Sequence, residues 1–381
     1  MRQQAPNVGT GIQCEIQPIQ DVELVKAMWL ELQADANGSY FLSWNWIGTW
    51  LDQLPSSTCP LLFIARDQDR VAGLAILVSR ALYRHGFVRS HAVFINKTGD
   101  DELDEITIEY NGVLAKLENR ARVTRAAIDF LIAEGWDEVF LDAYEATPDW
   151  PLRGTHWKAQ IRKSWPVFGV DLDRLKSDGI DFSQSLGRST RYQLRHAVRA
   201  YESLGEMHVE VAATKQNAEF YFSELQRMHQ AYWTDKGHRG AFANAALIRF
   251  HRALVANRFD SGEIQLIRIA FGGHTVGYLY NFGWNGSVLN YQSGLDYSLL
   301  PQTNRPGLVA HWAAIEHNAS KGNRYYDFLG GDSQHKRVMS NHASALDFMV
   351  ARRTCLKFRL EDALRSLWKY ARRHALGRPK S

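Results

Sequence analysis

Cysteine is scarce in this sequence. The three cysteines, Cys14, Cys59 and Cys355, are far apart, and none has the short spacing to another that a zinc site needs. Three scattered thiols also cannot build the dense disulfide framework of a small secreted scaffold. The cysteine usage therefore indicates a reducing compartment, and no metal is expected.

Long apolar runs and a leader segment are missing as well. No run approaches the roughly 20 residues with which a helix crosses a bilayer, and the polar start Met1-Arg2-Gln3-Gln4 is unlike a signal peptide. Apolar residues make up 45% and charged residues 23% of the 381 residues, as in ordinary globular proteins. We therefore expect a cytoplasmic protein, either of two domains or of two similar halves.

A broad excess of charge is also absent. The net charge is +4, but residues 352–381 hold ten Lys and Arg against Glu361 and Asp362, a balance of +8, so residues 1–351 carry −4. A slightly acidic body argues against a sequence-specific nucleic-acid partner. The basic segment has helical spacing from Leu360 to Leu376 with apolar residues on one side. This pattern favours docking on the body, with peripheral contact to the anionic inner face of a membrane as the alternative.

The second half has the clearest pattern of secondary structure. Residues 264–270 and 275–280 predict a hairpin around Gly272-Gly273, and residues 287–292 predict a third strand. From Leu308 the apolar residues repeat with helical spacing, and residues 324–329 predict a further strand. The order of hairpin, strand, helix and strand indicates an α/β unit.

The predicted helix begins at Arg305-Pro306-Gly307, where proline suits the first helical position. A helix start beside a strand edge presents free N–H groups and the positive end of the helix dipole, which suit a pyrophosphate. No dense glycine fingerprint is present. An ordinary α/β unit without a ligand is therefore the alternative interpretation.

The first half repeats this order of elements. The expected elements are a strand at 14–19, a helix at 22–32, a hairpin of 61–66 and 71–78, a strand at 106–110, a helix from Arg122 and a strand at 138–142. The repeat predicts a tandem duplicated fold, with one mixed β-sheet flanked by helices in each half. We predict a first half at residues 1–170, a second half at 171–350 and a basic C-terminal helix at 351–381. The first half lacks a counterpart of Arg305-Pro306-Gly307, so phosphate binding is expected in the second half.

Several side chains share helical faces. The stretch from Ser185 to Arg191 opens a predicted helix that reaches Tyr201. Its arginines, Arg188, Arg191, Arg195 and Arg199, fall in one narrow stripe next to an apolar side, and the stripe indicates either a solvated basic face or contact with phosphates or an acidic substrate. His229 and Trp233 share a face and either border a pocket or simply pack. Trp44, Trp46 and Trp50 crowd the second predicted helix of the first half. We expect them in the core rather than along a cleft.

Four motifs in the second half carry a resemblance to a known family. They are Arg188-x-x-Arg191-x-x-x-Arg195, His229-x-x-x-Trp233-x-x-x-Gly237, the run from Val276-Gly277-Tyr278 to Arg305-Pro306-Gly307, and Tyr326-Asp327-Phe328-Leu329-Gly330-Gly331-Asp332-x-x-His335-Lys336. Over about residues 184–340 the chain resembles the CelD-like GNAT acyltransferases, distant relatives of the FemAB peptidoglycan transferases. The resemblance implies two GNAT-like halves and acyl transfer from acyl-CoA, commonly acetyl-CoA, to an amine or a hydroxyl.

The resemblance also implies roles for individual residues. The pyrophosphate would rest on the backbone at Arg305, Pro306, Gly307 and Leu308, although Pro306 has no N–H and the usual glycine-rich loop is shortened here. The chemistry of acyl transfer, and not the resemblance, suggests the side chains: Asp327 is the candidate base or ammonium anchor, His335 an alternative base, Tyr291 a donor to sulfur, and Lys336 a phosphate partner. Asp327 and Asp332 capping the turn, and Tyr291 in the core, are the structural alternatives. Arg188, Arg191, Arg195, His229 and Trp233 complete the candidate site as substrate contacts.

We therefore expect an acyl-CoA-dependent acyltransferase that acts on an acceptor related to the cell envelope or to exopolysaccharide. Two alternatives stay open. One is a non-catalytic GNAT-fold scaffold that binds a polyanion, and the other is a Fem-like transferase that uses aminoacyl-tRNA. The sequence does not identify the acceptor, the length of the acyl chain or the oligomeric state, because function depends on the site and not on the fold.

Overall fold

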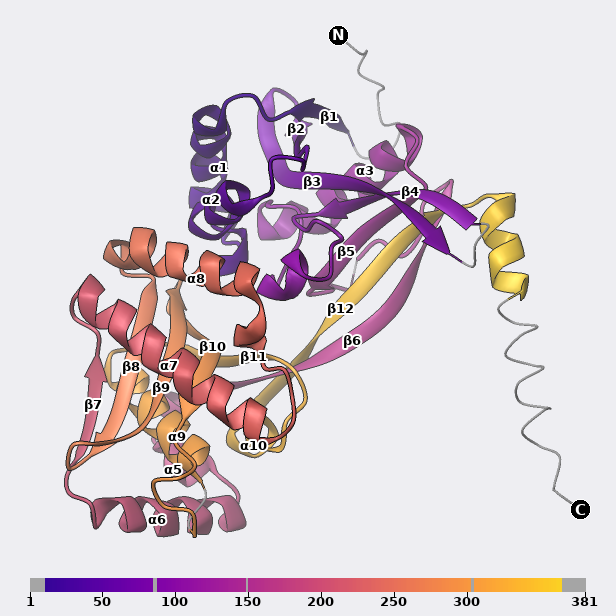
Figure 1. The fold of residues 1–381 in the computed structure, drawn as a ribbon. Helices are drawn as coiled ribbons and strands as arrows, with labels where there is room; N and C mark the ends of the chain where they lie inside the picture. Colours follow the sequence, from indigo (N-terminus) through magenta and orange to yellow (C-terminus); the bar gives the residue numbers. More distant parts are fainter. Residues whose placement is uncertain (1–10, 85–87, 149, 303–304, 365–381) are drawn as a thin grey trace, which may run out of the picture.

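The protein was studied as a computed structural model that describes residues 11–84, 88–148, 150–302 and 305–364 (Figure 1). The strands are β1 (Ile12–Pro18), β2 (Leu61–Asp67), β3 (Arg70–Arg84), β4 (Val88–Ile95), β5 (Glu138–Tyr144), β6 (Trp157–Asp171), β7 (Met207–Val211), β8 (Ile264–Phe271), β9 (His274–Trp284), β10 (Ser287–Leu295), β11 (Tyr325–Gly330) and β12 (His342–Arg353). The helices are α1 (Val22–Ala36), α2 (Trp44–Gln53), α3 (Arg120–Ala133), α4 (Leu172–Ser177), α5 (Phe182–Ser185), α6 (Arg188–Glu202), α7 (Lys215–Asp235), α8 (Ala245–Arg258), α9 (Pro306–Ser320) and α10 (Gln334–Met339).

The strands form one mixed sheet in the order β1-β2-β3-β4-β5-β12-β6-β11-β10-β9-β8-β7. The expectation of two separate sheets is therefore wrong, and the reason is an exchange of strands. β6 leaves the first half to pair with β11, and β12 leaves the second half to pair with β5. β6 and β12 then pair antiparallel with each other along most of their length, which joins the halves into a continuous sheet.

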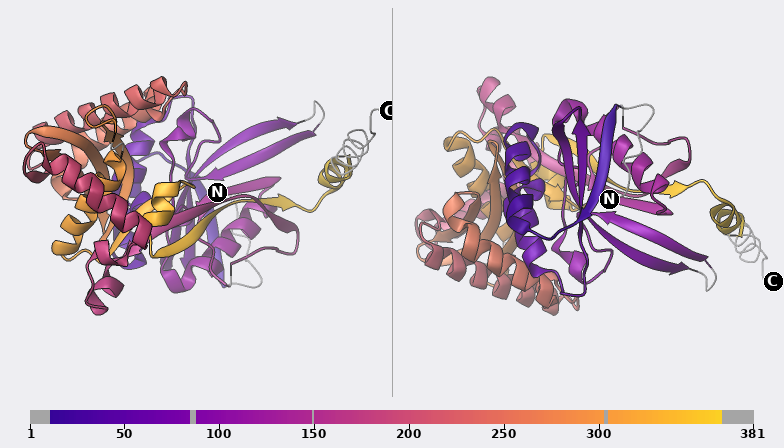
Figure 2. Two further views of the ribbon diagram at one scale, coloured as in Figure 1. Left: turned by 90° about the horizontal axis from the view of Figure 1, so that it is seen from below. Right: turned by 90° about the horizontal axis from the view of Figure 1, so that it is seen from above.

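The predicted duplication is visible in the order of elements. Each half runs strand, two helices, a three-strand meander, a helix, and a strand parallel to the end of the meander: β1 to β5 with α1, α2 and α3, and β7 to β11 with α7, α8 and α9. Each half then sends its last strand, β6 or β12, to the other half. The two halves lie side by side in both views of Figure 2.

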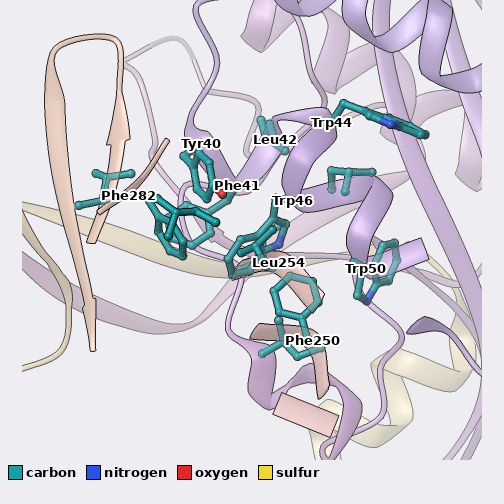
Figure 3. Close-up of a cluster of buried hydrophobic side chains, with 14 of the residues drawn as sticks. Tyr40, Phe41, Leu42, Trp44, Trp46, Trp50, Phe250, Leu254 and Phe282 are labelled. Atoms are coloured by element: carbon teal, nitrogen blue, oxygen red, sulfur yellow. The ribbon is translucent and has the colours of Figure 1, made fainter. Parts of the chain in front are cut away.

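Aromatic side chains of both halves meet in one buried cluster (Figure 3). Trp46 on α2 is 1% exposed, and its ring lies 4.7 Å from that of Phe250 on α8 and 5.8 Å from that of Phe282 on β9. Trp44 and Trp50 are also buried. The prediction that these tryptophans fill a core is confirmed, and because buried rings contribute large apolar areas, the cluster holds the two halves together.

Most predicted elements are present, with local differences. The hairpins of both halves, α1, α2, α6, α9 and β11 lie close to their expected positions. Residues 106–110, however, are not a strand. Thr107 and Tyr110 have φ angles of 51° and 47°, in the left-handed region, where an extended strand cannot continue. The segment instead crosses the sheet, as described below.

The basic C-terminal segment is described only to residue 364, so most of its predicted helix lies outside the described residues. Residues 356–364 are helical. Phe358 and Glu361 face the body and are buried, whereas Leu360 and Leu364 are 63% and 50% exposed. The described first turns of this helix therefore dock on the body through Phe358 and Glu361. The predicted docking side, which carries Leu360 and Leu364, is exposed instead. Within the described part of the chain, no helix is both long and apolar enough to cross a membrane.

Candidate active site

The candidate site lies where β10 and β11 separate. The two strands run parallel, and the last pair between them joins Leu289 to Asp327. Beyond this pair β10 continues to Leu295 and β11 to Gly330 without pairing to each other. A bulge at Tyr291 shifts the register of β10 against β9, and a bulge re-aims a strand locally. The sheet therefore opens into a V at its centre.

A cavity of about 740 Å³ fills this opening. We call it the first cavity. Its lining comes from the end of β10, the segment from Phe328 to Lys336, the start of α9, the end of α7, and the stretch Glu105 to Glu109 of the first half. A volume of this size is in the usual range for small-molecule sites.

The start of α9 borders the first cavity through Arg305, Gly307 and Leu308. Pro306 occupies the first turn of α9, as predicted, and its side chain is buried outside the lining. No side chain caps α9, and the earliest helical backbone bond runs from the N–H of Val309 to the carbonyl of Arg305. The N–H groups of Gly307 and Leu308 therefore have no partner within the helix, and the positive end of its dipole points toward the cavity mouth.

Asp327 lies at the apex of the V and is 3% exposed. Its Oδ2 accepts a hydrogen bond from the Tyr110 hydroxyl at 2.5 Å, and its Oδ1 accepts one from the N–H of Leu329 at 2.6 Å. Burial raises the pKa of Asp327 to about 6, although both hydrogen bonds act in the opposite direction. The second bond is the turn cap that the sequence offered as an alternative, so Asp327 both caps the turn and titrates near neutrality.

Glu109 is a candidate that the sequence did not reveal. It comes from the first half, is 5% exposed, lines the first cavity, and accepts a hydrogen bond from the N–H of Gly330 at 2.6 Å. Burial raises its pKa to about 7. A carboxylate that titrates near neutral pH is well suited to general base catalysis. In the sequence, the one sign of a functional role for Glu109 is a charged residue in a stretch that otherwise alternates Ile106, Ile108 and Tyr110.

Lys336 and His335 border the same cavity. The Nζ of Lys336 donates to the carbonyls of Leu329 and Gly330 at 3.1 and 2.8 Å, and burial lowers its pKa. The ring of His335 stacks on that of His311, with centroids 5.5 Å apart. Desolvation by the surrounding protein, helped by the positive Lys336, lowers the pKa of His335 to about 4. Burial also lowers the pKa of His311 well below its usual value, so the neutral form of both histidines is favoured at pH 7.

Tyr291 also lines the first cavity, but its hydroxyl donates to the carbonyl of Ile106. Burial raises its pKa well above the usual value, so the hydroxyl keeps its proton. This bond and the two made by Glu109 and Tyr110 fasten the segment 106–110 across β10 and β11. The Tyr291 side chain therefore has a structural role. The backbone of Tyr291, in contrast, lies in the bulge and is out of register with β9.

The predicted substrate contacts are divided by the structure. His229 and Trp233, on α7, both line the first cavity. His229 is 8% exposed, and its Nδ1 has no hydrogen-bond partner among the described residues. Arg188, Arg191 and Arg195 lie on α6, which packs against α9 and contributes no residue to the lining of the cavity. The structure therefore brings the histidine and the tryptophan to the site but leaves the arginine stripe outside it.

Comparisons with known proteins agree with this geometry. Residues 188–337 match the model of the acetyltransferase (GNAT) domain family. A comparison with curated protein sequences gave no match. The crystal structure of FemX aligns with 92% of this chain and 99% of its own at 12% identity and a TM-score of 0.54. The structure of L-PGS from Bacillus licheniformis aligns with 88% of this chain and 93% of its own at 10% identity and a TM-score of 0.51.

These structural likenesses extend along almost the whole chain. Because the sequence identities are low, they show a shared fold and not a shared activity. The family match covers the elements from α6 to α10, which include the V, the start of α9 and the turn after β11. The resemblance found in the sequence is confirmed over residues 188–337, which match the acetyltransferase (GNAT) domain family, and the chain as a whole has a mixed α/β GNAT-like fold.

Proposed function

We propose that the protein transfers an acyl group from acyl-CoA, with acetyl-CoA as the donor, to an amine or a hydroxyl group. The observation that carries this proposal is the first cavity. It opens between the separating strands β10 and β11, at an uncapped helix start, and the buried carboxyl group of Glu109, whose pKa is raised, lines it. A second buried carboxyl group of raised pKa, that of Asp327, lies at the apex of the V. These are the groups that acyl transfer from a thioester needs.

The donor's pyrophosphate would lie at the start of α9. The N–H groups of Gly307 and Leu308 point out of the helix end, and the exposed Arg305 has no ion pair within the described residues. Backbone donors, the helix dipole and a guanidinium together favour a dianion. Lys336, on the opposite side of the opening, adds positive charge, although two of its protons are already bonded to carbonyls.

The thioester would lie along β10, with its carbonyl at the bulge. An N–H of the peptide at Tyr291, released from the strand ladder, would polarise the thioester oxygen and stabilise negative charge there. Asp327 at the apex, or Glu109 beside it, would take the proton from the acceptor. Since both carboxyl groups titrate between about pH 6 and 7, each has a reactive ionised fraction at neutral pH.

His335 and Tyr291 have smaller parts in this proposal. A histidine whose pKa is about 4 is a weak base, so His335 would orient the donor with its partner His311. The Tyr291 hydroxyl holds the segment 106–110 and does not reach a leaving sulfur while it donates to Ile106. The Nδ1 of His229, which has no hydrogen-bond partner in the described part of the chain, would provide a polar contact in the first cavity.

The class of acceptor rests on the family resemblance alone. It suggests a precursor of the cell envelope or of exopolysaccharide, modified in the cytoplasm or at the inner face of a membrane. The exposed leucines at residues 360 and 364, followed by a basic sequence, are consistent with a peripheral membrane contact.

Thermal denaturation with acetyl-CoA and with CoA tests the donor. A ligand at 100 times its Kd stabilises the native state by about 2.7 kcal/mol, a shift that is readily measured. Arg305→Ala should weaken binding by about ten- to a hundredfold, because a charge-assisted hydrogen bond contributes about 1.5–3 kcal/mol. Arg249→Ala, at an exposed position of α8, is the matched control and should bind normally.

Absence of any shift with either thioester or thiol would overturn the proposal. In that case the scaffold interpretation predicts stabilisation by a polyanion such as heparin, with loss in the variants of the α6 arginines. The Fem-like interpretation predicts that aminoacyl-tRNA, and not acetyl-CoA, protects the protein.

A further inference from the structure

A second cavity, of about 420 Å³, lies next to the first. Its floor is the paired part of β10 and β11, from Ser287 to Leu289 and from Tyr325 to Asp327. Its walls come from the link after α1, the turn between β9 and β10, the start of α3 and the beginning of β12. The second cavity is therefore formed by both halves of the chain.

One chain segment separates the two cavities. Glu109 lines the first cavity and its neighbour Tyr110 lines the second. On β11, Asp327 lines the second cavity, and Leu329, two residues further on the same face, lines the first. Consecutive residues are about 3.8 Å apart along a chain, so the partition is about one residue thick. Asp327 sits at the boundary, beside the point where β10 and β11 separate.

The second cavity holds charges of both signs. Asp327 and Glu145 face it and repel each other, and this repulsion adds to the effect of burial on the pKa of Asp327. An ammonium group placed between two carboxylates would remove the repulsion. Arg120 also lines the cavity, near enough to Glu145 for their opposite charges to interact, and its Nε is buried without a hydrogen-bond partner among the described residues. Buried polar atoms normally have partners, so a ligand oxygen is favoured there.

The rest of the lining both donates and accepts hydrogen bonds. The amide of Asn285 donates to that of Asn37 at 2.9 Å, and the hydroxyl of Tyr325 is 2.9 Å from Nδ1 of His342. Trp284 adds an aromatic surface to the same wall. Hydroxyl groups need neighbours of both kinds, and the C–H face of a sugar ring packs well on an aromatic ring.

We propose that the second cavity is the acceptor site and that its ligand is an amino sugar. This inference rests on the proposed function, because it places the acceptor on the opposite side of the partition from the acyl donor. The ammonium group lies at Asp327 and Glu145, and the ring hydroxyls face Arg120 and the amides. The nitrogen is thereby held at the boundary of the two cavities, beside the pair of Leu289 and Asp327 at which β10 and β11 separate.

The reaction balances with these groups. The ammonium gives one proton to the carboxylate of Asp327, and the neutral amine attacks the thioester carbon. A C–N bond forms, the C–S bond breaks, and the sulfur leaves with a second proton from the nitrogen. The products are an amide and free CoA, and Asp327 then releases its proton to water.

Release of free CoA, measured with a thiol reagent, tests the proposal with D-glucosamine as the probe. Glucosamine should be acylated with saturation, whereas N-acetylglucosamine, whose amine is blocked, should not react. Glu145→Gln should raise the KM for glucosamine by about tenfold, and Ser344→Phe, which fills part of the second cavity, by at least as much. Neither variant should change the KM for acetyl-CoA or the thermal shift with CoA. Glu134→Gln, an exposed carboxylate at the end of α3, is the control.

The outcomes separate the two proposals. If acetyl-CoA and CoA do not stabilise the protein, the proposed function fails, and the acceptor site fails with it. If they do stabilise it but glucosamine releases no CoA, or if L-lysine reacts better, the amino-sugar assignment is wrong and the donor site stands. If both cavity variants leave the KM for glucosamine unchanged, the acceptor binds elsewhere.

Discussion

Tyr110→Phe isolates the hydrogen bond at the centre of the candidate site. The Tyr110 hydroxyl donates to Oδ2 of Asp327, and burial keeps the pKa of Tyr110 well above its ordinary value, so the donor is present at every pH of interest. This bond lowers the pKa of Asp327, which burial has raised to about 6. Its removal should raise that pKa further, because the ionised form loses more than the neutral form.

The magnitude follows from the charge on the acceptor. A hydrogen bond to a charged group contributes about 1.5–3 kcal/mol, and a neutral one about 0.5–1.5 kcal/mol. The folded pKa of Asp327 already lies above the value in an unfolded chain, so its contribution to stability is greatest below about pH 4 and is lost as the pH rises through 6. Tyr110→Phe should raise the folded pKa of Asp327 by about one further unit. The protein should then lose about 1.4 kcal/mol more of its free energy of unfolding above that pKa.

Urea denaturation at pH 5 and pH 8 measures the effect without any substrate. Tyr110→Phe should lower the free energy of unfolding at both values, and by about 1–2 kcal/mol more at pH 8 than at pH 5. Tyr201→Phe is the control, because the buried Tyr201 hydroxyl has no hydrogen-bond partner among the described residues. An equal loss at both pH values would refute the assignment of a raised pKa to a carboxylate held by this hydroxyl.

Three other predictions concern the rest of the molecule. Glu138→Gln should destabilise the protein by about 3–5 kcal/mol in urea denaturation, because Glu138 is 2% exposed and pairs with Arg352 at 3.0 Å. His251 should destabilise the wild-type protein as the pH falls below about 6.5, against the opposite contribution of Asp327, since burial lowers the pKa of His251 to about 3 and the unfolded chain binds that proton first. His251→Phe should remove about 3 kcal/mol of that destabilisation by pH 4, measured by the same method. Replacing Leu360 and Leu364 by serine should reduce flotation with anionic vesicles, and equal recovery would remove the membrane contact.

Local patterns predicted much of the fold. The hairpin of β8 and β9 follows from alternation around Gly272-Gly273, and the start of α9 follows from Pro306. The apolar side predicted for α6 is confirmed, since Leu194, Ala197 and Tyr201 are the buried residues of that helix. Each of these features depends on residues that are near one another in the sequence, so a single sequence contains the necessary information.

The features that were missed depend on distant parts of the chain. β6 and β12 have several charged and exposed positions and no clean alternation, because they are stabilised by pairing with each other and with the opposite half. Residues 106–110 do alternate, with Ile106, Ile108 and Tyr110 at every second position. Tertiary contacts nevertheless bend this segment across the sheet, where its side chains bond to Asp327 and Gly330.

The exchange of β6 and β12 accounts for the composition of the candidate site. Because each half contributes a strand to the centre of the sheet, the V between β10 and β11 lies against the first half and not against solvent. The first half can then place Glu109 and Tyr110 over the strands of the GNAT domain, between the two cavities. The matched domain at residues 188–337 contains the opening in which we propose that the donor binds, but it lacks these two side chains. In the proposed mechanism the first half would therefore supply what the matched domain lacks, namely a wall of the proposed acceptor cavity and a carboxylate beside the proposed position of the thioester.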